Sequence, residues 1–302
     1  MPLAYCLPLP LTMKQRLDLI LVERGLAESR AKAQALIMAG DVLVDGQRVD
    51  KAGTQISPEA EIAVRRNLPY VSRGGLKLAH ALEVFGLRER VAGRVTLDIG
   101  ASTGGFTDVL LQAGSRLVYA VDVGTNQLAW KLRTDPRVVV MEQTNIRDLR
   151  ALPPANDHQH AAGDTPPLAD LATADVSFIG LDIITPAAMH LTAPDAFFVF
   201  LIKPQFEAGR EKVGKGGVVR DPAVHRDVII RLVNTWRDMG LYFADLTRSP
   251  ITGPAGNIEY LVHLEKSAPT ADNQYAPGPM QQAVQQTLEQ IVSSEVLKHG
   301  ES

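Results

Sequence analysis

The chain has 302 residues, of which 45% are hydrophobic and 22% charged, a length and composition typical of a globular protein with two domains. Its single cysteine, Cys6, excludes an internal disulfide and a cysteine-based metal site, and no apolar run approaches the roughly 20 residues that span a bilayer. The formal net charge of −3 argues against nucleic-acid binding, but residues 14–77 carry 11 Lys and Arg against 8 Asp and Glu, which favours a polyanionic partner for this part.

A leader and two helices open the chain. Residues 1–13 are apolar and proline-rich but lack the basic start and long apolar stretch of a secretory signal, so we expect a disordered leader, with Met13 as an alternative start. Apolar residues at helical spacing predict a helix over 14–24. Ser29 is a good N-cap for a second helix, which Gly40 is placed to end.

A hairpin follows the two helices. Residues 42–44 are an apolar run that predicts a strand, and Asp45-Gly46 is a strong short signal for a hairpin turn. After the returning strand, residues 61–64 predict one more. Residues 14–65 are therefore expected to form a small α+β unit with basic side chains along it.

This basic unit resembles an S4-type RNA-binding domain, a module that is similar across several RNA-modifying enzymes and a ribosomal protein. The resemblance rests on Arg16-Leu17-Asp18, Ser29-Arg30-Ala31-Lys32-Ala33, Gly40 and Val42-Leu43-Val44-Asp45-Gly46. Basic residues alone would fit a helical hairpin with a solvated face, whereas the ordered arginines, caps and turn favour RNA binding. With the arginines that follow, the predicted RNA-binding residues are Arg16, Arg30, Lys32, Arg48, Arg65, Arg66 and Arg73.

Residues 66–72 are expected to be a linker, and residues 73–265 alternate strand-like and helix-like segments. The strand candidates are 95–99, 117–123, 138–141, 171–178, 197–203, 241–246 and 258–264. This alternation predicts an α/β domain with a doubly wound, seven-stranded, mostly parallel sheet of Rossmann-like form. We expect residues 153–167 to form a surface insertion, and residues 266–302 to form a polar tail with a helix over 280–298.

A glycine-rich turn follows the first predicted strand, where Asp98 precedes a G-x-x-x-G-G pattern that starts at Gly100. A dinucleotide fingerprint would be G-x-G-x-x-G, so this pattern suits a ligand without a pyrophosphate, such as an amino-acid moiety. Asp122 ends the next strand and can accept hydrogen bonds from both hydroxyls of a ribose, and Glu142 or Asn145 follows where an adenine would lie. Each residue alone fits a turn, but the ordered set predicts an S-adenosylmethionine site. Its expected members are Asp98, Gly100, Ala101, Ser102, Thr103, Gly104, Gly105, Phe106, Asp122 and Asn145.

Four charged residues stand at equivalent edges of the predicted sheet. Lys77 enters the first helix of the domain, Asp175 and Lys203 close strands, and Glu259 lies in the last strand. Ligands of open sheets bind beyond the carboxyl ends of the strands, so a lysine that closes a buried strand indicates a site. A surface lysine with its head in solvent is the ordinary reading, but Pro204 and the polar turn after it place the Lys203 ammonium near the cofactor cleft.

The order Lys, Asp, Lys and Glu resembles that of the ribose 2′-O-methyltransferases related to the heat-shock methyltransferase FtsJ. Together with the front domain, the chain over roughly residues 14–265 resembles the TlyA/hemolysin-A family of ribosomal RNA methyltransferases. The motifs that carry this are Val71-Ser72-Arg73-Gly74-Gly75, residues 97–107, Asp175-Val176-Ser177-Phe178-Ile179, Lys203-Pro204-Gln205-Phe206-Glu207 and Gly256-Asn257-Ile258-Glu259. The resemblance implies methyl transfer from S-adenosylmethionine to the ribose 2′-hydroxyl of a cytidine nucleotide in ribosomal RNA. It also implies that Lys203 is the base, which the sequence alone does not separate from Lys77.

Three other functions stay open at this point. One is a methyltransferase that acts on DNA, protein or a small molecule, although nitrogen-methylating enzymes often carry an Asn/Asp-Pro-Pro-aromatic run where this chain has Asp175-Val176-Ser177-Phe178. The others are a non-catalytic RNA-binding or ribosome-assembly factor and a membrane-active hemolysin. We expect ribosomal RNA or ribosomal subunits as partners, no stable membrane association, no metal and a cytoplasmic location. The nucleotide, the subunit and the oligomeric state are open.

Overall fold

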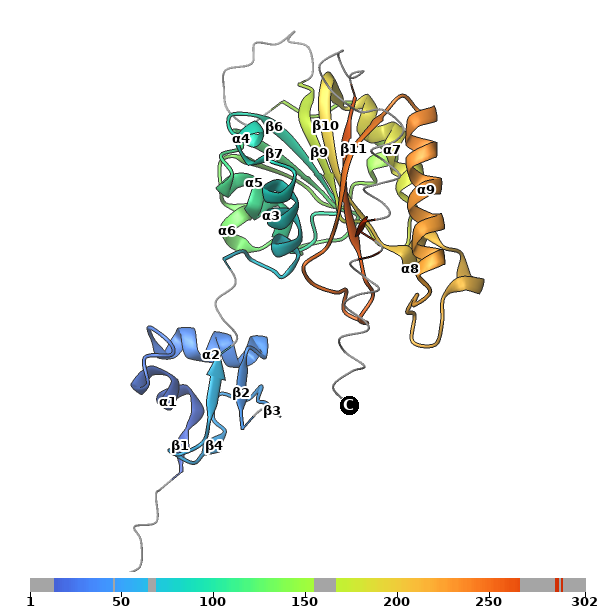
Figure 1. Ribbon diagram of the computed structural model, residues 1–302. Helices are drawn as coiled ribbons and strands as arrows, with labels where there is room; N and C mark the ends of the chain where they lie inside the picture. The colour runs from blue at the N-terminus through green and yellow to red at the C-terminus, as the bar shows by residue number, and fades with distance from the viewer. Residues whose placement is uncertain are drawn as a thin grey trace, which may run out of the picture. The chain divides into compact units, whose positions relative to one another are not determined.

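Two compact units make up the chain, Met1–Pro69 and Tyr70–Ser302. The structure is a computed structural model that describes residues 14–45, 47–64, 69–154 and 167–266, together with 286, 287 and 289 (Figure 1). The predicted leader, Gly46, Arg65, Arg66, residues 155–166 of the expected insertion and nearly all of the predicted tail lie outside these residues. Residues 286, 287 and 289 are helical and fall within the helix predicted over 280–298.

The first unit is a small α+β fold around one apolar core. Its helices are α1 (Leu17–Glu23) and α2 (Arg30–Ala39), and its strands are β1 (Gln15–Arg16), β2 (Val42–Val44), β3 (Gln47–Arg48), β4 (Gln55–Ile56) and β5 (Ile62–Val64). Strand β2 pairs with β3 and β5, and β1 pairs with β4, all antiparallel. The Ser29 hydroxyl accepts a hydrogen bond from the Lys32 amide, and Gly40 ends α2 at a φ of 74°, as the sequence predicted.

A seven-stranded sheet forms the centre of the second unit. Its strands are β6 (Val95–Ile99), β7 (Leu117–Val121), β8 (Val138–Met141), β9 (Ala169–Ala174), β10 (Thr192–Ile202), β11 (Tyr242–Arg248) and β12 (Tyr260–Glu265). The order along the sheet is β11-β12-β10-β9-β6-β7-β8. Strand β12 runs antiparallel to both of its neighbours, and the other pairings are parallel. The predicted α/β class with a doubly wound, mostly parallel sheet is therefore confirmed.

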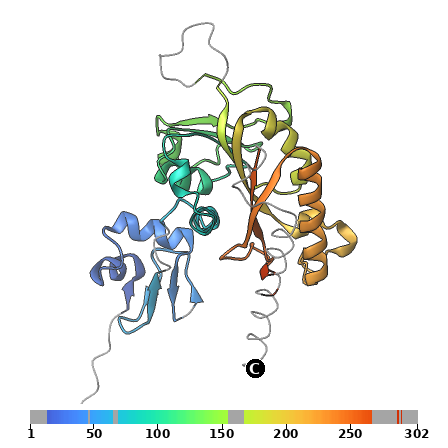
Figure 2. The same ribbon diagram turned by 45° about the horizontal axis from the view of Figure 1, so that its top comes forward.

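Helices cover both faces of this sheet (Figures 1 and 2). One face carries α3 (Gly74–Val84), α4 (Arg88–Val91), α5 (Gly105–Gln112) and α6 (Trp130–Arg133); the other carries α7 (Leu181–His190), α8 (Pro204–Glu207) and α9 (Pro222–Asp238). Successive residues of β7 enter different cores: Tyr119 belongs to the same buried cluster as Trp236 of α9, whereas Val118 belongs to the cluster that contains Leu82 of α3. Among the residues that the structure describes, no helix combines the length and apolar character needed to cross a bilayer.

Two features of this topology position the site. The chain runs from β6 to β7 and β8 on one side and then returns to β9 on the other, so a topological switch point lies between β6 and β9, where open sheets bind ligands. The strand predicted over 171–178 is observed as β9 and ends at Ala174. Phe178 has a φ of 64°, which a strand does not accept, so Asp175 and the residues after it form a loop at this edge.

Candidate active site

Two cavities open beyond β6 and β9, with volumes of about 470 Å³ and about 430 Å³. They share a wall formed by Gly100 and Ser102 after β6 and by Asp175, Ser177 and Phe178 after β9. The larger cavity also contains Lys77, Lys203 and Glu259, and the smaller one contains Asp122 and Asn145. The two cavities thus bring all four predicted catalytic residues and five of the ten predicted cofactor residues together at the switch point.

The turn after β6 requires glycine because the next loop passes very close to it. Gly100 has a φ of 80°, and a Cβ atom there would lie 2.7 Å from the carbonyl oxygen of Asp175. Ser102 then turns with a φ of 47°, and its backbone amide donates a hydrogen bond of 2.8 Å to Asp122 Oδ2. The loops that follow β6, β7 and β9 are therefore held against one another where the two cavities meet.

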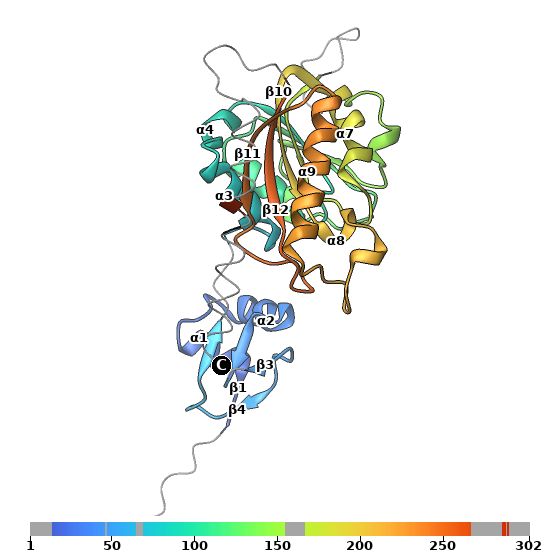
Figure 3. The ribbon, with the colours of Figure 1, turned by 45° about the vertical axis from the view of Figure 1, so that its right-hand side comes forward.

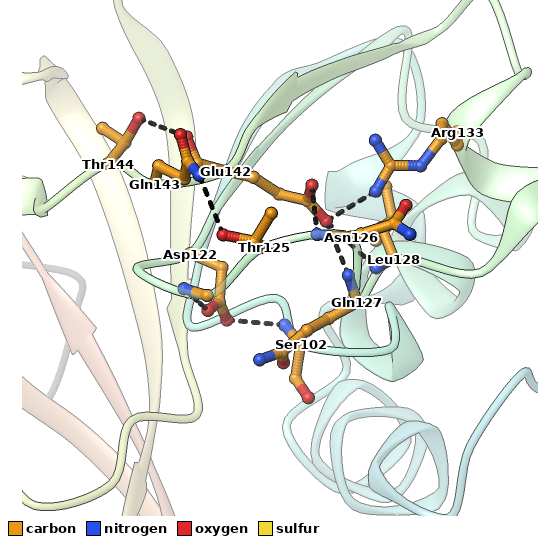
Figure 4. Close-up of polar contacts among 11 residues, drawn as sticks. Ser102, Asp122, Thr125, Asn126, Gln127, Leu128, Arg133, Glu142, Gln143 and Thr144 are labelled. Atoms are coloured by element: carbon orange, nitrogen blue, oxygen red, sulfur yellow. Dashed lines mark hydrogen bonds and ion pairs between the residues drawn. The ribbon is translucent and has the colours of Figure 1, made fainter.

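Asp122 follows β7 and Glu142 follows β8, and the two carboxylates make different contacts (Figure 4). Asp122 accepts backbone hydrogen bonds from Ser102 and Gly124 and lines the smaller cavity. Glu142 is fully engaged elsewhere: it accepts hydrogen bonds from Arg133, at 2.6 Å, and from the backbone amides of residues 126–128. The hydrogen bond from Arg133 lowers the pKa of Glu142 to about 2. Of the two residues left open for the adenine, Asn145 is the one that lines the cavity.

The glycine-rich run divides into residues that line the cavities and residues that support them. Gly100, Ser102 and Thr103 line a cavity, whereas neither lining includes Ala101, Gly104, Gly105 or Phe106. A Cβ at Gly105 would lie 2.8 Å from the Gly75 nitrogen, so this glycine lets α3 and α5 approach closely. Phe106 is 3% exposed and belongs to the apolar core. These four residues, predicted as cofactor contacts, therefore lie outside both linings.

Asp98 also lies beneath the turn and not on a cavity wall. Its side chain is fully buried and accepts hydrogen bonds from Thr107 Oγ1 at 2.6 Å and Thr173 Oγ1 at 3.2 Å. Burial raises the pKa of Asp98 to about 7, although the threonine hydrogen bonds oppose this rise. The position differs from the direct ligand contact expected from the sequence, because the Asp98 side chain projects into the interface between the sheet and α5.

Lys77, Asp175, Lys203 and Glu259, here called the charged tetrad, form two ion pairs in the larger cavity. Lys77 Nζ lies 2.5 Å from Glu259 Oε2, and Lys203 Nζ lies 2.6 Å from Asp175 Oδ1. Exposure is 7% for Lys77, 9% for Lys203 and 1% for Glu259, so these charges are largely withdrawn from water. The tetrad that the sequence predicted from four separate segments is therefore assembled in one place.

The fold explains how each tetrad side chain reaches the cavity. Lys77 lies in the first turns of α3, and Lys203 is the N-cap of α8, where Pro204 starts a new helix as soon as β10 ends. Asp175 follows β9, and Glu259 directly precedes β12. Since β12 is antiparallel to its neighbours, its first residue meets the carboxyl ends of the parallel strands.

Several residues that line the larger cavity received no role from the sequence. Ser177 Oγ accepts a hydrogen bond of 2.9 Å from Lys203 Nζ, and Gln205 Nε2 lies 3.4 Å from Glu259 Oε1. Phe178 is 90% exposed, and its ring centroid lies 4.7 Å from that of Phe206. All four lie two or three residues after Asp175 or Lys203 in the sequence, which is the signal that could have indicated them.

In the first unit, Arg16 and Arg30 converge on Asp18, whose side chain is fully buried. Arg16 donates two hydrogen bonds of 2.9 Å, Arg30 donates one of 3.0 Å, and Gln34 donates another of 2.9 Å. The hydrogen bonds from Arg16 hold the pKa of Asp18 well below its usual range. Because the side chains of Arg16 and Arg30 are 39% and 55% exposed, the positive charges face solvent while the negative charge is covered.

The other predicted RNA-binding residues lie in different settings. Lys32 is exposed at the start of α2. The guanidinium of Arg48 occupies the space beside Gly40 that a side chain there would need. Arg73 belongs to the second unit, where it precedes α3 and lines the larger cavity.

Comparison with known proteins identifies both units. Residues 70–266 match the FtsJ-like methyltransferase family, and residues 15–62 match the S4 domain. The candidate rRNA methyltransferase YqxC of Bacillus subtilis (strain 168) is 49% identical, across 87% of this chain and 90% of that protein. The 16S/23S rRNA (cytidine-2'-O)-methyltransferase TlyA of Mycobacterium tuberculosis (strain ATCC 25618 / H37Rv) is 44% identical, across 83% and 90%.

A solved structure resembles the whole chain as well. A protein of Streptococcus thermophilus described as a candidate hemolysin matches with a TM-score of 0.66 and 44% identity, across 94% of this chain and 99% of that one. The chain is a methyltransferase that belongs to the FtsJ-like methyltransferase family and carries an S4 domain.

Proposed function

We propose that this enzyme transfers the methyl group of S-adenosylmethionine to the 2′-hydroxyl of a cytidine ribose in ribosomal RNA, and that it acts in the cytoplasm. The observation that carries the proposal is the charged tetrad, whose two lysine–carboxylate pairs lie in a cavity joined to a second, more apolar one. The activity in the name of TlyA from Mycobacterium tuberculosis and the presence of an S4 domain support ribosomal RNA as the substrate.

The smaller cavity fits the nucleoside part of the methyl donor. Asp122 offers carboxylate oxygens that suit a ribose diol. Asn145 is a polar group for the edge of a base, and Ile146 and Ile179 supply apolar wall for its faces. The bound donor supplies an activated methyl group on a positively charged sulfur. Gly100 and Ser102, which line both cavities, would offer it their backbone carbonyls, because their amides already donate to Val121 and Asp122.

The position of Lys203 supports its assignment as the base. Its partner Asp175 lines both cavities, whereas Lys203, Lys77 and Glu259 line only the larger one. The Lys203–Asp175 pair therefore adjoins the wall that the two cavities share, where donor and acceptor have to meet. In its neutral form, Lys203 Nζ accepts the proton of the ribose hydroxyl as that oxygen attacks. Asp175 and Ser177 fix the direction of the amine through contacts of 2.6 and 2.9 Å.

The Lys77–Glu259 pair is assigned to orientation of the acceptor. Its members are more deeply buried than Asp175, and Glu259 also contacts Gln205. A buried, mutually satisfied pair holds a fixed geometry, and positioning of the hydroxyl in line with the methyl group supplies a large part of the rate.

The test is transfer of labelled methyl from S-adenosylmethionine to separated, unmodified ribosomal subunits, followed by mapping of ribose methylation. Wild type and Lys203→Ala are compared, and cofactor binding to both is measured directly. Label at a cytidine ribose that the variant loses supports the proposal. Cofactor binding without label on either subunit would mean that the methyl acceptor is a molecule other than the ribosomal subunits. Absence of cofactor binding would contradict the enzymatic proposal itself.

A further inference from the structure

A basic loop joins α8 to α9 beside the larger cavity. This 209–220 loop carries four cationic side chains, all of them exposed, and one acid, Glu211. The four are Arg210, Lys212, Lys215 and Arg220. Within the part of the chain that the structure describes, none of these four side chains forms an ion pair. Most other exposed arginines of the unit differ in this respect: Arg226 pairs with Asp227, for example, and Arg237 with Asp238.

The loop is anchored by buried polar groups. Asn257 is 3% exposed, and both polar atoms of its side chain bond to the backbone of the loop. Nδ2 donates a hydrogen bond of 2.8 Å to the Gly217 carbonyl, and Oδ1 accepts one of 3.1 Å from the Val219 backbone amide. His225 is 2% exposed and lies within hydrogen-bond distance of both the Val219 carbonyl and the Tyr260 hydroxyl. Burial of such groups is costly unless they are satisfied, so these contacts fix the base of the loop.

The same anchors tie the loop to the catalytic cavity. Asn257 lies two residues before Glu259, in the connection between β11 and β12 that contributes Ile251, Thr252 and Pro254 to the cavity wall. At its other end, the loop continues from α8, which contributes Gln205 and Phe206. Figures 1 and 3 show both connections extending from the same end of the sheet. The base of the loop is thus fixed to the two connections that line the larger cavity, in which the acceptor hydroxyl must lie.

We propose that the 209–220 loop is a second RNA-binding element, which holds the phosphates that flank the target nucleotide through Arg210, Lys212, Lys215 and Arg220. The inference rests on the proposed function, since it assigns a task to the rim of that same site. A run of phosphates carries one negative charge per nucleotide. Exposed cations without carboxylate partners can bind these phosphates, and the release of the counterions that surround the RNA favours this binding. A fixed loop base suits the placing of one particular ribose over a cavity, because the phosphates on either side of it are then held in register.

The experiment measures equilibrium binding of full-length protein to unmodified ribosomal subunits and to protein-free ribosomal RNA, over a range of salt concentrations. The loop variant replaces all four cations with glutamine. We expect a loss of affinity on the order of tenfold to a thousandfold for both forms of RNA, and a salt slope that falls by about one per cation that contacts phosphate. S-adenosylmethionine binding is expected to stay unchanged. Lys212→Arg combined with Lys215→Arg keeps the charge and is expected to bind like wild type.

The matched control replaces Arg88 and Arg116 with glutamine. Both are exposed and precede β6 and β7, at the edge of the sheet opposite the cavities, and we expect no change in RNA affinity. Unchanged RNA binding by the loop variant would overturn the inference. So would a defect seen with subunits but not with protein-free RNA, because the loop would then contact a ribosomal protein. If wild type binds RNA through the loop yet methylates no ribose, the proposed function fails and the RNA-binding loop stands.

Discussion

At the scale of single residues, the two lysines of the tetrad differ in their surroundings. Lys203 contacts Asp175, which lines both cavities, and Ser177, whereas Lys77 contacts Glu259 deeper in the larger cavity. Both lysines lie in ion pairs with a carboxylate, so replacement by alanine removes the partner of that carboxylate together with the amine. Replacement by arginine separates the two tasks, because a guanidinium keeps the charge but does not release its proton in proteins.

Lys203→Arg should therefore lower kcat by about 10²- to 10⁴-fold, the usual contribution of a general base, with the affinity for S-adenosylmethionine retained. Lys77→Arg should act mainly on KM for RNA, since the pair with Glu259 orients the acceptor. Single-turnover rates and cofactor titrations on both variants provide the measurement. A larger loss of rate in Lys77→Arg than in Lys203→Arg would reverse the assignment of the base.

Asp98 predicts a pH dependence of stability. Burial raises its pKa from 3.8 to about 7, so the folded protein binds this proton more tightly than the unfolded chain does. The stability that protonated Asp98 contributes is complete below pH 3.8 and is lost as the pH rises to about 7. Relative to Asp98→Asn, the wild-type free energy of unfolding should fall by up to ~1.4 kcal/mol per pH unit within that window and then level off.

Urea unfolding of wild type and Asp98→Asn at a series of pH values measures this difference. The comparison between the two proteins removes the contribution of groups that titrate in both. A difference that does not change with pH between 4 and 8 would mean that Asp98 is charged in the folded protein, against the burial observed.

At the scale of elements, the single turn α8 connects three parts of the active site. Lys203 caps it, Gln205 reaches Glu259, and Phe206 packs on Phe178. Glu207 is the last residue of α8, and its side chain is 4% exposed. Its Oε1 accepts a hydrogen bond of 2.9 Å from the Leu181 amide at the start of α7. The loop with Asp175, Ser177 and Phe178 is therefore held from both ends, by β9 and by this contact.

Glu207→Ala is predicted to release that loop. Because the Leu181 amide would lose its acceptor, we expect Asp175 and Ser177 to hold Lys203 less well, with kcat reduced on the order of tenfold or more. Glu207→Gln keeps an acceptor for the amide and should recover most of the rate. Arg231→Gln tests the ion pair separately, since Arg231 contacts Glu207 Oε2 at 3.0 Å and leaves the hydrogen bond between Oε1 and the Leu181 amide in place. Equal defects in Glu207→Gln and Glu207→Ala would show that the negative charge, not the amide contact, matters.

The elements also show what the sequence could and could not predict. Strong apolar runs such as β6 and β8 were predicted with correct bounds, and the caps Ser29 and Gly40 were correct, because these signals are local. The two-residue strands β1 and β4 were missed, since they exist only through their pairing with each other. The end of β9 and the setting of Asp98 depend on contacts with distant loops and helices, which residue spacing does not contain. Local patterns thus indicated which residues belong to the site, and tertiary packing decided which of them face the cavity.

At the scale of the whole molecule, a chain with a formal charge of −3 presents positive charge in selected places. In the first unit, Arg16 and Arg30 cover the buried Asp18, so their charges face outward. In the second unit, Arg73 lines the larger cavity, and the 209–220 loop carries four exposed cations. Local fields of this kind steer a polyanion even when the net charge of the protein is negative.

If both units contact the same RNA, their contributions to its binding should combine. Arg30→Gln with Lys32→Gln weakens the first unit and leaves Asp18 its contacts with Arg16 and Gln34. The glutamine variant of the 209–220 loop weakens the second unit. Because counterion release adds over phosphate contacts, a protein with both sets of substitutions should show the summed decrease in salt slope and the product of the two losses in affinity for unmodified subunits. Cofactor binding, which involves neither set, should be equal in all four proteins. A combined variant that binds no more weakly than the poorer of the two single-unit variants would mean that one unit does not engage RNA in the complex that is methylated.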